Sequence, residues 1–131
     1  MVKIGSGAVS WSSKLQPVVT LSSTEAEYIA AVEAGKELKW MRSLLEEFGY
    51  KFDKPSTLYI DNQSAINVSK NPVHHGRMKH LDLRNHWLRE NVEAGIISPV
   101  HIGTGEMTAD CLTKALARVK HDKCRIGLGL V

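Results

Sequence analysis

Apolar and polar positions recur along the chain with two different periods, which separates helical from extended segments. Over residues 22–49 the apolar positions follow the helical period. Ser22 and Glu25 fit a capping box at the start of this segment, and Gly49 suits the position just past a helix end. These signals predict one long amphipathic helix.

The remaining segments are shorter. Residues 56–60 are apolar enough for a largely buried strand, and Pro99 suggests that a strand over 96–102 is interrupted. Further expected elements are a strand–turn–strand segment in 7–22 and helices over 62–70, 80–95 and 108–120. Strands that alternate with helices predict an α/β sheet covered by helices.

Composition agrees with a single globular domain. The 131 residues are 43% hydrophobic and 24% charged, enough for one domain with a proper core. No apolar run is long enough to span a membrane, and the amino terminus has no signal-peptide pattern. Cys111 and Cys124 do not make a disulfide framework, so we expect reduced thiols in an intracellular protein of the cytoplasm or nucleus.

Charge is distributed unevenly. Residues 1–69 carry seven Lys/Arg and eight Asp/Glu, whereas residues 70–131 carry ten and six, together with all six histidines. A polyanionic partner facing the second half would explain this difference. A solvated basic surface without a partner is the alternative. The histidines and cysteines lack zinc-site spacing.

Three carboxylates lie where apolar or neutral residues are expected. Glu27 shares the i, i+4, i+7 stripe of the long helix with Ala31 and Ala34, which points it toward the sheet. Asp61 ends a strand, where ligands of open α/β sheets gather. Asp110 lies near the start of the last helix. A helix-dipole role for Glu27 and Asp110, or an N-cap role for Asp61, is the structural alternative.

Taken together, the three acids favour a metal site. Clustered carboxylates repel one another unless cations neutralise them, and Mg²⁺ prefers oxygen ligands. Two such ions about 3.5–4 Å apart can support phosphodiester cleavage.

Four motifs then give the sequence a family resemblance. "SWSSKLQPVVTLSSTEAEYIAA", "YIDNQSAI", "NPVHHGRMKHLDLRNHWLRE" and "TADCLTKAL" occur in this order between about Gly5 and Leu116. This combination closely resembles the ribonuclease H domain of copia-type (Ty1-like) retrotransposon polyproteins. The resemblance implies a ribonuclease H-like fold over residues 1–131, with a mixed five-stranded sheet flanked by helices.

The resemblance also implies an activity, which is hydrolysis of the RNA strand of RNA–DNA hybrids with Mg²⁺ or Mn²⁺. Matched by motif, Glu27, Asp61 and Asp110 correspond to three of the family's four catalytic, metal-binding acids. The family's first Asp lies on a strand upstream of "GAVSW", but no acid precedes Glu25 here. The resemblance thus implies an amino-terminally truncated domain without the family's first strand and with both metal sites weakened.

A missing central strand would leave a sheet edge open. Either another chain supplies a strand, or the strands rearrange, or two copies pair edge to edge. A homodimer formed by edge pairing or strand exchange is our hypothesis.

The basic segment 70–90 suggests how a hybrid would be held. Lys70, Arg77 and Lys79 are candidates for contacts to the phosphate backbone, which need no sequence readout. Asn62 and Gln63 beside Asp61 are candidates for sensing the ribose 2′-OH. An ordinary solvated helix surface is the alternative.

The sequence leaves three functions open. They are a ribonuclease H-type enzyme, a catalytically inactive retroelement-derived nucleic-acid-binding module, and a protein-interaction module on the same scaffold.

Overall fold

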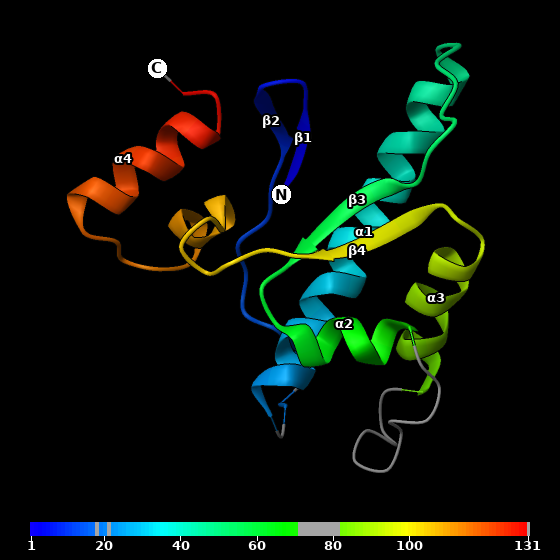
Figure 1. Cartoon of the computed structure of the whole chain (residues 1–131), viewed down its shortest axis with the longest axis horizontal. Helices are drawn as coiled ribbons and strands as arrows, with labels where there is room; N and C mark the ends of the chain where they lie inside the picture. Colours follow the sequence, from blue (N-terminus) through cyan, green and yellow to red (C-terminus); the bar gives the residue numbers. More distant parts are fainter. Residues whose placement is uncertain (18, 21, 71–81, 131) are drawn as a thin grey trace. The chain divides into compact units, whose positions relative to one another are not determined.

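The computed structural model describes residues 1–17, 19–20, 22–70 and 82–130 of the chain. The chain divides into two compact units. The terminal unit comprises Met1–Pro17 and Ile102–Val131, and the central unit comprises Val18–His101. Each unit has its own strands and helices (Figure 1). The expectation of one domain over residues 1–131 stays a prediction.

The central unit contains three helices and a parallel pair of strands. Its elements are α1 (Ser23–Glu47), β3 (Ser56–Ile60), α2 (Gln63–Lys70), α3 (Asp82–Glu93) and β4 (Ile97–His101). Strands β3 and β4 pair in parallel, with Ser56 opposite Ile97 and Ile60 opposite His101. Parallel strands need a long crossover, and α2 and α3 provide it here. Figure 1 shows α2 in green and α3 in yellow-green, which follow β3 and precede β4 along the chain.

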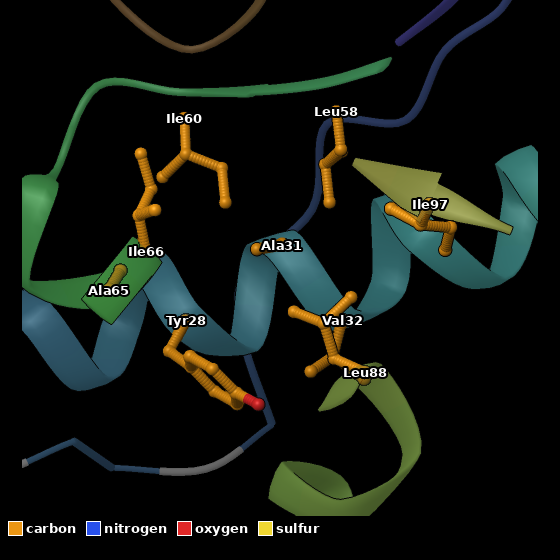
Figure 2. Close-up of a cluster of buried hydrophobic side chains, with 9 residues drawn as sticks. All are labelled: Tyr28, Ala31, Val32, Leu58, Ile60, Ala65, Ile66, Leu88 and Ile97. Atoms are coloured by element: carbon orange, nitrogen blue, oxygen red, sulfur yellow. The ribbon is translucent and has the colours of Figure 1, made fainter. Parts of the chain in front are cut away.

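The core of the central unit lies between the strand pair and the helices. Side chains alternate along β3, so that Leu58 and Ile60 are buried while Tyr59 is exposed. The inner face of the strands packs against α1, and α2 and α3 complete the cluster (Figure 2). Its buried members are Tyr28, Ala31, Val32, Leu58, Ile60, Ala65, Ile66, Leu88 and Ile97.

The ends of α1 agree with the signals in the sequence. The Ser22 hydroxyl accepts a hydrogen bond from the Glu25 N–H at 3.1 Å, which satisfies one of the free donors of the first turn. Gly49 follows the helix with φ of +88°, a conformation that glycine adopts without steric cost. The predicted start and end of this helix are confirmed.

The buried face of α1 includes Ala31 of the predicted stripe but not Glu27. The larger side chains of Tyr28, Ile29 and Val32 turn inward, and the acid that is buried with them is Glu25, at 8% exposure. Glu27 is exposed. The prediction that Glu27 points along the apolar stripe is wrong, because burying the bulkier positions removes more apolar surface from water and rotates the helix accordingly.

The terminal unit joins the two ends of the chain. Strands β1 (Val2–Ile4) and β2 (Gly7–Ser10) form an antiparallel hairpin, and the later part consists of the 3₁₀ helix η3 (Thr108–Leu112) and helix α4 (Arg118–Gly127). The Ala8 N–H donates to the Leu128 carbonyl at 2.9 Å, which ties the hairpin to the end of α4.

Two predictions for this unit are wrong in detail. Strand 7–10 pairs with residues 2–4 through a turn at Gly5, where φ is +60°, rather than with a strand later in 7–22. The expected helix over 108–120 ends as a 3₁₀ turn at Leu112, and α4 begins at Arg118.

The α/β class is confirmed at a coarse level, as a mixed structure of helices and small sheets. In the part of the chain described here, the strands form two separate two-stranded sheets. The five-stranded ribonuclease H-like sheet and the edge-paired or strand-exchanged homodimer stay predictions. None of the described helices has both the length and the apolar character needed to cross a membrane.

Candidate active site

Asp61 stands at the carboxyl end of β3, between a buried strand and a helix. Ile60 before it is anchored in the core, and Asp61 itself is partly exposed. The cap of α2 comes from the next residue, because the Asn62 side-chain oxygen accepts from the Ala65 N–H at 3.1 Å. The N-cap explanation for Asp61 is therefore wrong. Helix capping does not explain why an acid follows the strand at this position.

Glu27 lies on α1, in the same unit as Asp61. It directly precedes Tyr28, which is buried in the cluster that also holds Ile60 and Ala65 (Figure 2). Asp61 directly follows Ile60. The two acids are thus attached at the backbone to members of one core cluster, and both side chains reach solvent.

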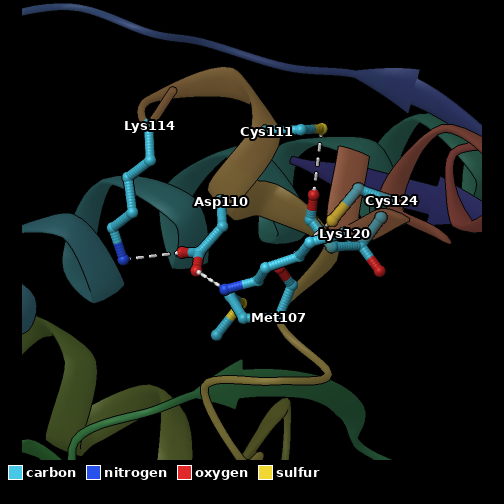
Figure 3. Close-up of polar contacts among 7 residues, drawn as sticks. Met107, Asp110, Cys111, Lys114, Lys120 and Cys124 are labelled. Atoms are coloured by element: carbon cyan, nitrogen blue, oxygen red, sulfur yellow. Dashed lines mark hydrogen bonds and ion pairs between the residues drawn. The ribbon is translucent and has the colours of Figure 1, made fainter. Parts of the chain in front are cut away.

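Asp110 belongs to the terminal unit and has a different environment. It is 4% exposed and lies in η3. Lys114 Nζ is 2.8 Å from Oδ1 of Asp110, and Lys120 Nζ is 3.2 Å from Oδ2 (Figure 3). Burial alone would raise the pKa of Asp110, but the hydrogen bonds and charges of the two lysines outweigh burial and lower it. The partners that stabilise this acid are lysine side chains, which the helix-dipole explanation did not include.

The two lysines were missed by sequence reasoning for different reasons. Asp110 and Lys114 have i, i+4 spacing, a signal that was available in "TADCLTK". Lys120 is ten residues from Asp110, which is about 15 Å along a continuous helix. Only the break between η3 and α4 allows Lys120 to return to Asp110, and nothing in the hydrophobic pattern marks that break.

The candidate nucleic-acid contacts are placed only in part. Gln63 Nε2 donates to Asn67 Oδ1 at 3.2 Å, and Lys70 is exposed at the end of α2. Arg77 and Lys79 lie outside the described residues.

Part of the basic charge near the carboxyl terminus is already compensated. Lys123 pairs with Glu106, and both Arg118 and Arg125 lie 3.9 Å from Asp122. These cations therefore present a weaker field to a polyanion than their number suggests.

Carboxylate oxygens are suitable donors for Mg²⁺ or Mn²⁺. Glu27 and Asp61 belong to one unit and Asp110 to the other, where an ammonium group already lies against each of its oxygens. Across the described ranges, no group of three or more His, Cys, Asp or Glu side chains is placed to hold a metal ion.

Comparison with known proteins gives a consistent origin for the chain. It is 48% identical over 124 residues to the retrovirus-related Pol polyprotein from transposon TNT 1-94 of Nicotiana tabacum, a match over 95% of this chain. The corresponding polyproteins from transposons RE2 and RE1 of Arabidopsis thaliana are 41% and 42% identical over 100% and 90% of this chain.

These matches cover a small part of each relative, because the chain spans only 8–9% of the polyproteins' length. No protein-family model matches the chain. No solved structure matches it significantly. The homologues that cover the chain are thus retrovirus-related Pol polyproteins from transposons, and the chain corresponds to a short region of them.

Proposed function

We propose that this chain is the ribonuclease H-like region of a retrotransposon polyprotein and hydrolyses the RNA strand of RNA–DNA hybrids with Mg²⁺ or Mn²⁺. Two lines of argument support this proposal. The motifs "LSSTEAEY", "YIDNQSAI" and "TADCLTKAL" occur in family order, and the homologues are polyproteins of transposons.

The position of Asp61 is the observation that carries the proposal. A carboxylate at the carboxyl end of a parallel strand lies where α/β folds bind ligands. Asn62 supplies the cap of the following helix, so the local fold does not require an acid at position 61. A functional role accounts for the choice of aspartate there.

The other two acids are included in the proposal because they match the family's motifs. Glu27 is exposed on α1, which packs against β3. Asp110 would join a metal site only after at least one of its two ammonium partners is displaced.

The residues around Asp61 also suggest how the hybrid is recognised. The oxygen of Asn62 is used by the helix cap, which leaves its amide nitrogen as the group that would donate to a ribose 2′-OH. Gln63 lies one residue further on, at the start of α2. Lys70, Arg77 and Lys79 follow as the proposed phosphate contacts, which hold the duplex without reading its sequence.

A second candidate is a catalytically inactive module that binds nucleic acid or a protein partner. The observation that favours it is the state of Asp110, whose two oxygens are both engaged by lysines. On this alternative the chain keeps the scaffold but not the cutting reaction.

A cleavage and binding assay on the full chain separates the candidates. The substrate is an RNA–DNA duplex with labelled RNA, incubated with Mg²⁺ or Mn²⁺, beside the same RNA in single-stranded form. Asp61→Asn and Glu27→Gln are the test variants. Asp53→Asn and Glu33→Gln are the matched controls, because they remove exposed acids from the same unit.

Each outcome selects one candidate. Hybrid-specific cleavage that is lost in Asp61→Asn but kept in Asp53→Asn supports the enzyme. No cleavage, with hybrid binding whose logarithm falls linearly with the logarithm of salt concentration, supports the nucleic-acid-binding module. Neither cleavage nor binding rejects the enzyme and the nucleic-acid-binding module, and leaves the protein-interaction module.

A further inference from the structure

The carboxylate of Asp110 has one cation on each oxygen. Lys114 Nζ lies 2.8 Å from Oδ1 and Lys120 Nζ lies 3.2 Å from Oδ2, while the Asp110 side chain is almost completely buried (Figure 3). A buried carboxylate is costly unless charges and hydrogen bonds compensate it. The two ammonium groups provide that compensation from opposite ends of the carboxylate.

The two lysines come from different segments of the terminal unit. Lys114 follows η3, whereas Lys120 lies in the first turn of α4. Residues 113–117 between these elements are outside both helices. We call the cluster Lys114–Asp110–Lys120 the lysine clamp. Through it, Asp110 of η3 is paired with Lys120 of α4 across the connecting residues.

Packing around the lysine clamp brings the same two elements together. A Cβ added to Gly127 of α4 would lie 3.0 Å from the Thr108 side chain of η3. Cys124 of α4 is buried with its thiol 4.0 Å from the Met107 carbonyl. The clamp thus acts at a closely packed interface, where Asp110 is 5% exposed and the stems of Lys114 and Lys120 reach solvent, at 51% and 35% exposure.

We propose that Lys114 and Lys120 are built-in counter-cations of Asp110, which occupy the cation positions on its carboxylate and use it to tie η3 to α4. Asp110 is then a stabilising ion-pair residue in the metal-free chain, whatever role the chain has toward nucleic acid. The inference does not depend on nuclease activity.

The chain contains a matched control for this clamp. Lys123 pairs with Glu106, and this pair also connects α4 to the segment before η3. Its side chains are 57% and 64% exposed, whereas Lys120 is 35% and Asp110 is 5% exposed. An exposed pair contributes little to stability. Lys123→Met therefore removes a lysine of α4 without leaving a buried carboxylate unpaired.

The first experiment measures thermal unfolding of the full chain. We expect Lys120→Met to lower the Tm by about 5 °C and Lys123→Met to leave it nearly unchanged. Lys120→Arg, which keeps the positive charge, should retain most of the stability. Equal Tm values for Lys120→Met and Lys123→Met would overturn the proposal.

The sharper test is whether the change in Tm caused by Asp110→Asn reverses its sign when both lysines are absent. In the wild-type background Asp110→Asn should lower the Tm, because both lysines lose their acid. In the Lys114→Met/Lys120→Met background the same substitution should raise it, because it removes a buried charge without a partner. A lowering of similar size in both backgrounds would show that Asp110 acts through shape or hydrogen bonding alone, and would contradict the proposal.

Two measurements do not require the double variant to fold. Acylation of lysine amines in the native protein, followed by mass spectrometry, should modify Lys120 more slowly than Lys123, and Asp110→Asn should remove the difference. Equal rates in the wild type would contradict the clamp. Millimolar Mg²⁺ should give no Asp110-dependent rise in Tm, whereas a rise that disappears in Asp110→Asn would show that a divalent cation replaces the lysines.

Discussion

Gly35 of α1 faces the ring of Trp87 so closely that an added Cβ would lie 3.1 Å from Cζ3. The same Cβ would lie 3.3 Å from Ile97 and 3.4 Å from Leu88. The glycine is buried in the middle of a 25-residue helix. It therefore serves close packing of α1 against α3 and β4.

Gly35→Ala should destabilise the protein in spite of the better helix propensity of alanine. The propensity gain is about 1 kcal/mol, whereas crowding three core side chains costs about 1–3 kcal/mol. We expect a net loss of about 1 kcal/mol in the free energy of unfolding, measured by urea denaturation. Ala30→Gly on the exposed side of α1 calibrates the propensity term. A stabilised Gly35→Ala variant would show that the helices separate at little cost.

Asn62, rather than Asp61, should control the stability of α2. Asn62→Ala removes the side-chain acceptor of the Ala65 N–H and should cost about 1 kcal/mol. Asn62→Asp keeps the acceptor and should restore most of this loss. Asp61→Asn should change the free energy of unfolding little, so that any loss of function in that variant is not a loss of fold. Equal destabilisation by Asn62→Ala and Asp61→Asn would contradict the assignment of the cap.

The elements of the fold that could be predicted from the sequence are those whose signals lie within a few residues of one another. The ends of α1 and the strand over 56–60 were predicted correctly, because a cap, a glycine and an apolar run each act within a few residues. The hairpin of Val2–Ile4 with Gly7–Ser10 was missed, because its only local mark is the turn at Gly5.

The candidate site was predictable to a similar extent. Asp61 was expected to follow a strand, and β3 does end at Ile60 directly before it, while the role of Asp61 stays a prediction. The direction of Glu27 was predicted wrongly: Ala31 of the predicted stripe is buried, but the acid that is buried beside Tyr28 and Val32 is Glu25. The lysine clamp on Asp110 depends on the break after Leu112, which is a tertiary feature.

Acid should weaken the lysine clamp. The folded-state pKa of Asp110 is lowered despite burial, because Lys114 and Lys120 stabilise its charged form. The unfolded chain then binds the proton more readily, so the contribution of Asp110 is complete above the ordinary pKa of an aspartate and is lost as the pH falls through the lowered folded-state pKa. The stability difference between wild type and Asp110→Asn should shrink over this acidic range. A difference that stays constant would indicate no linkage to this carboxyl group.

Alkali should weaken the central unit through Tyr28. Burial raises the pKa of Tyr28 to about 12, and the positive charge of Arg89 offsets only part of that effect. The folded state therefore holds the proton more tightly, and the contribution of Tyr28 is complete below about pH 10 and lost as the pH rises toward 12.

Tyr28→Phe should remove this part of the alkaline dependence. The difference in free energy of unfolding between the wild type and the variant is measured by denaturation at increasing pH. It should change by about 2 kcal/mol between about pH 10 and pH 12. Tyr59→Phe is a suitable control because Tyr59 is exposed. An identical alkaline profile for wild type and Tyr28→Phe would show that Tyr28 ionises as freely in the folded chain as in the unfolded one.

Catalysis at the end of β3 is the central claim, and the rate of RNA cleavage in an RNA–DNA hybrid tests it most directly. Wild type and Asp61→Asn are compared side by side with Mg²⁺, after both have been shown to be folded. We expect the wild type to cut the RNA strand of the hybrid and Asp61→Asn to fall to the background rate. Cleavage at the same rate in both proteins, or none in the wild type, would contradict the claim.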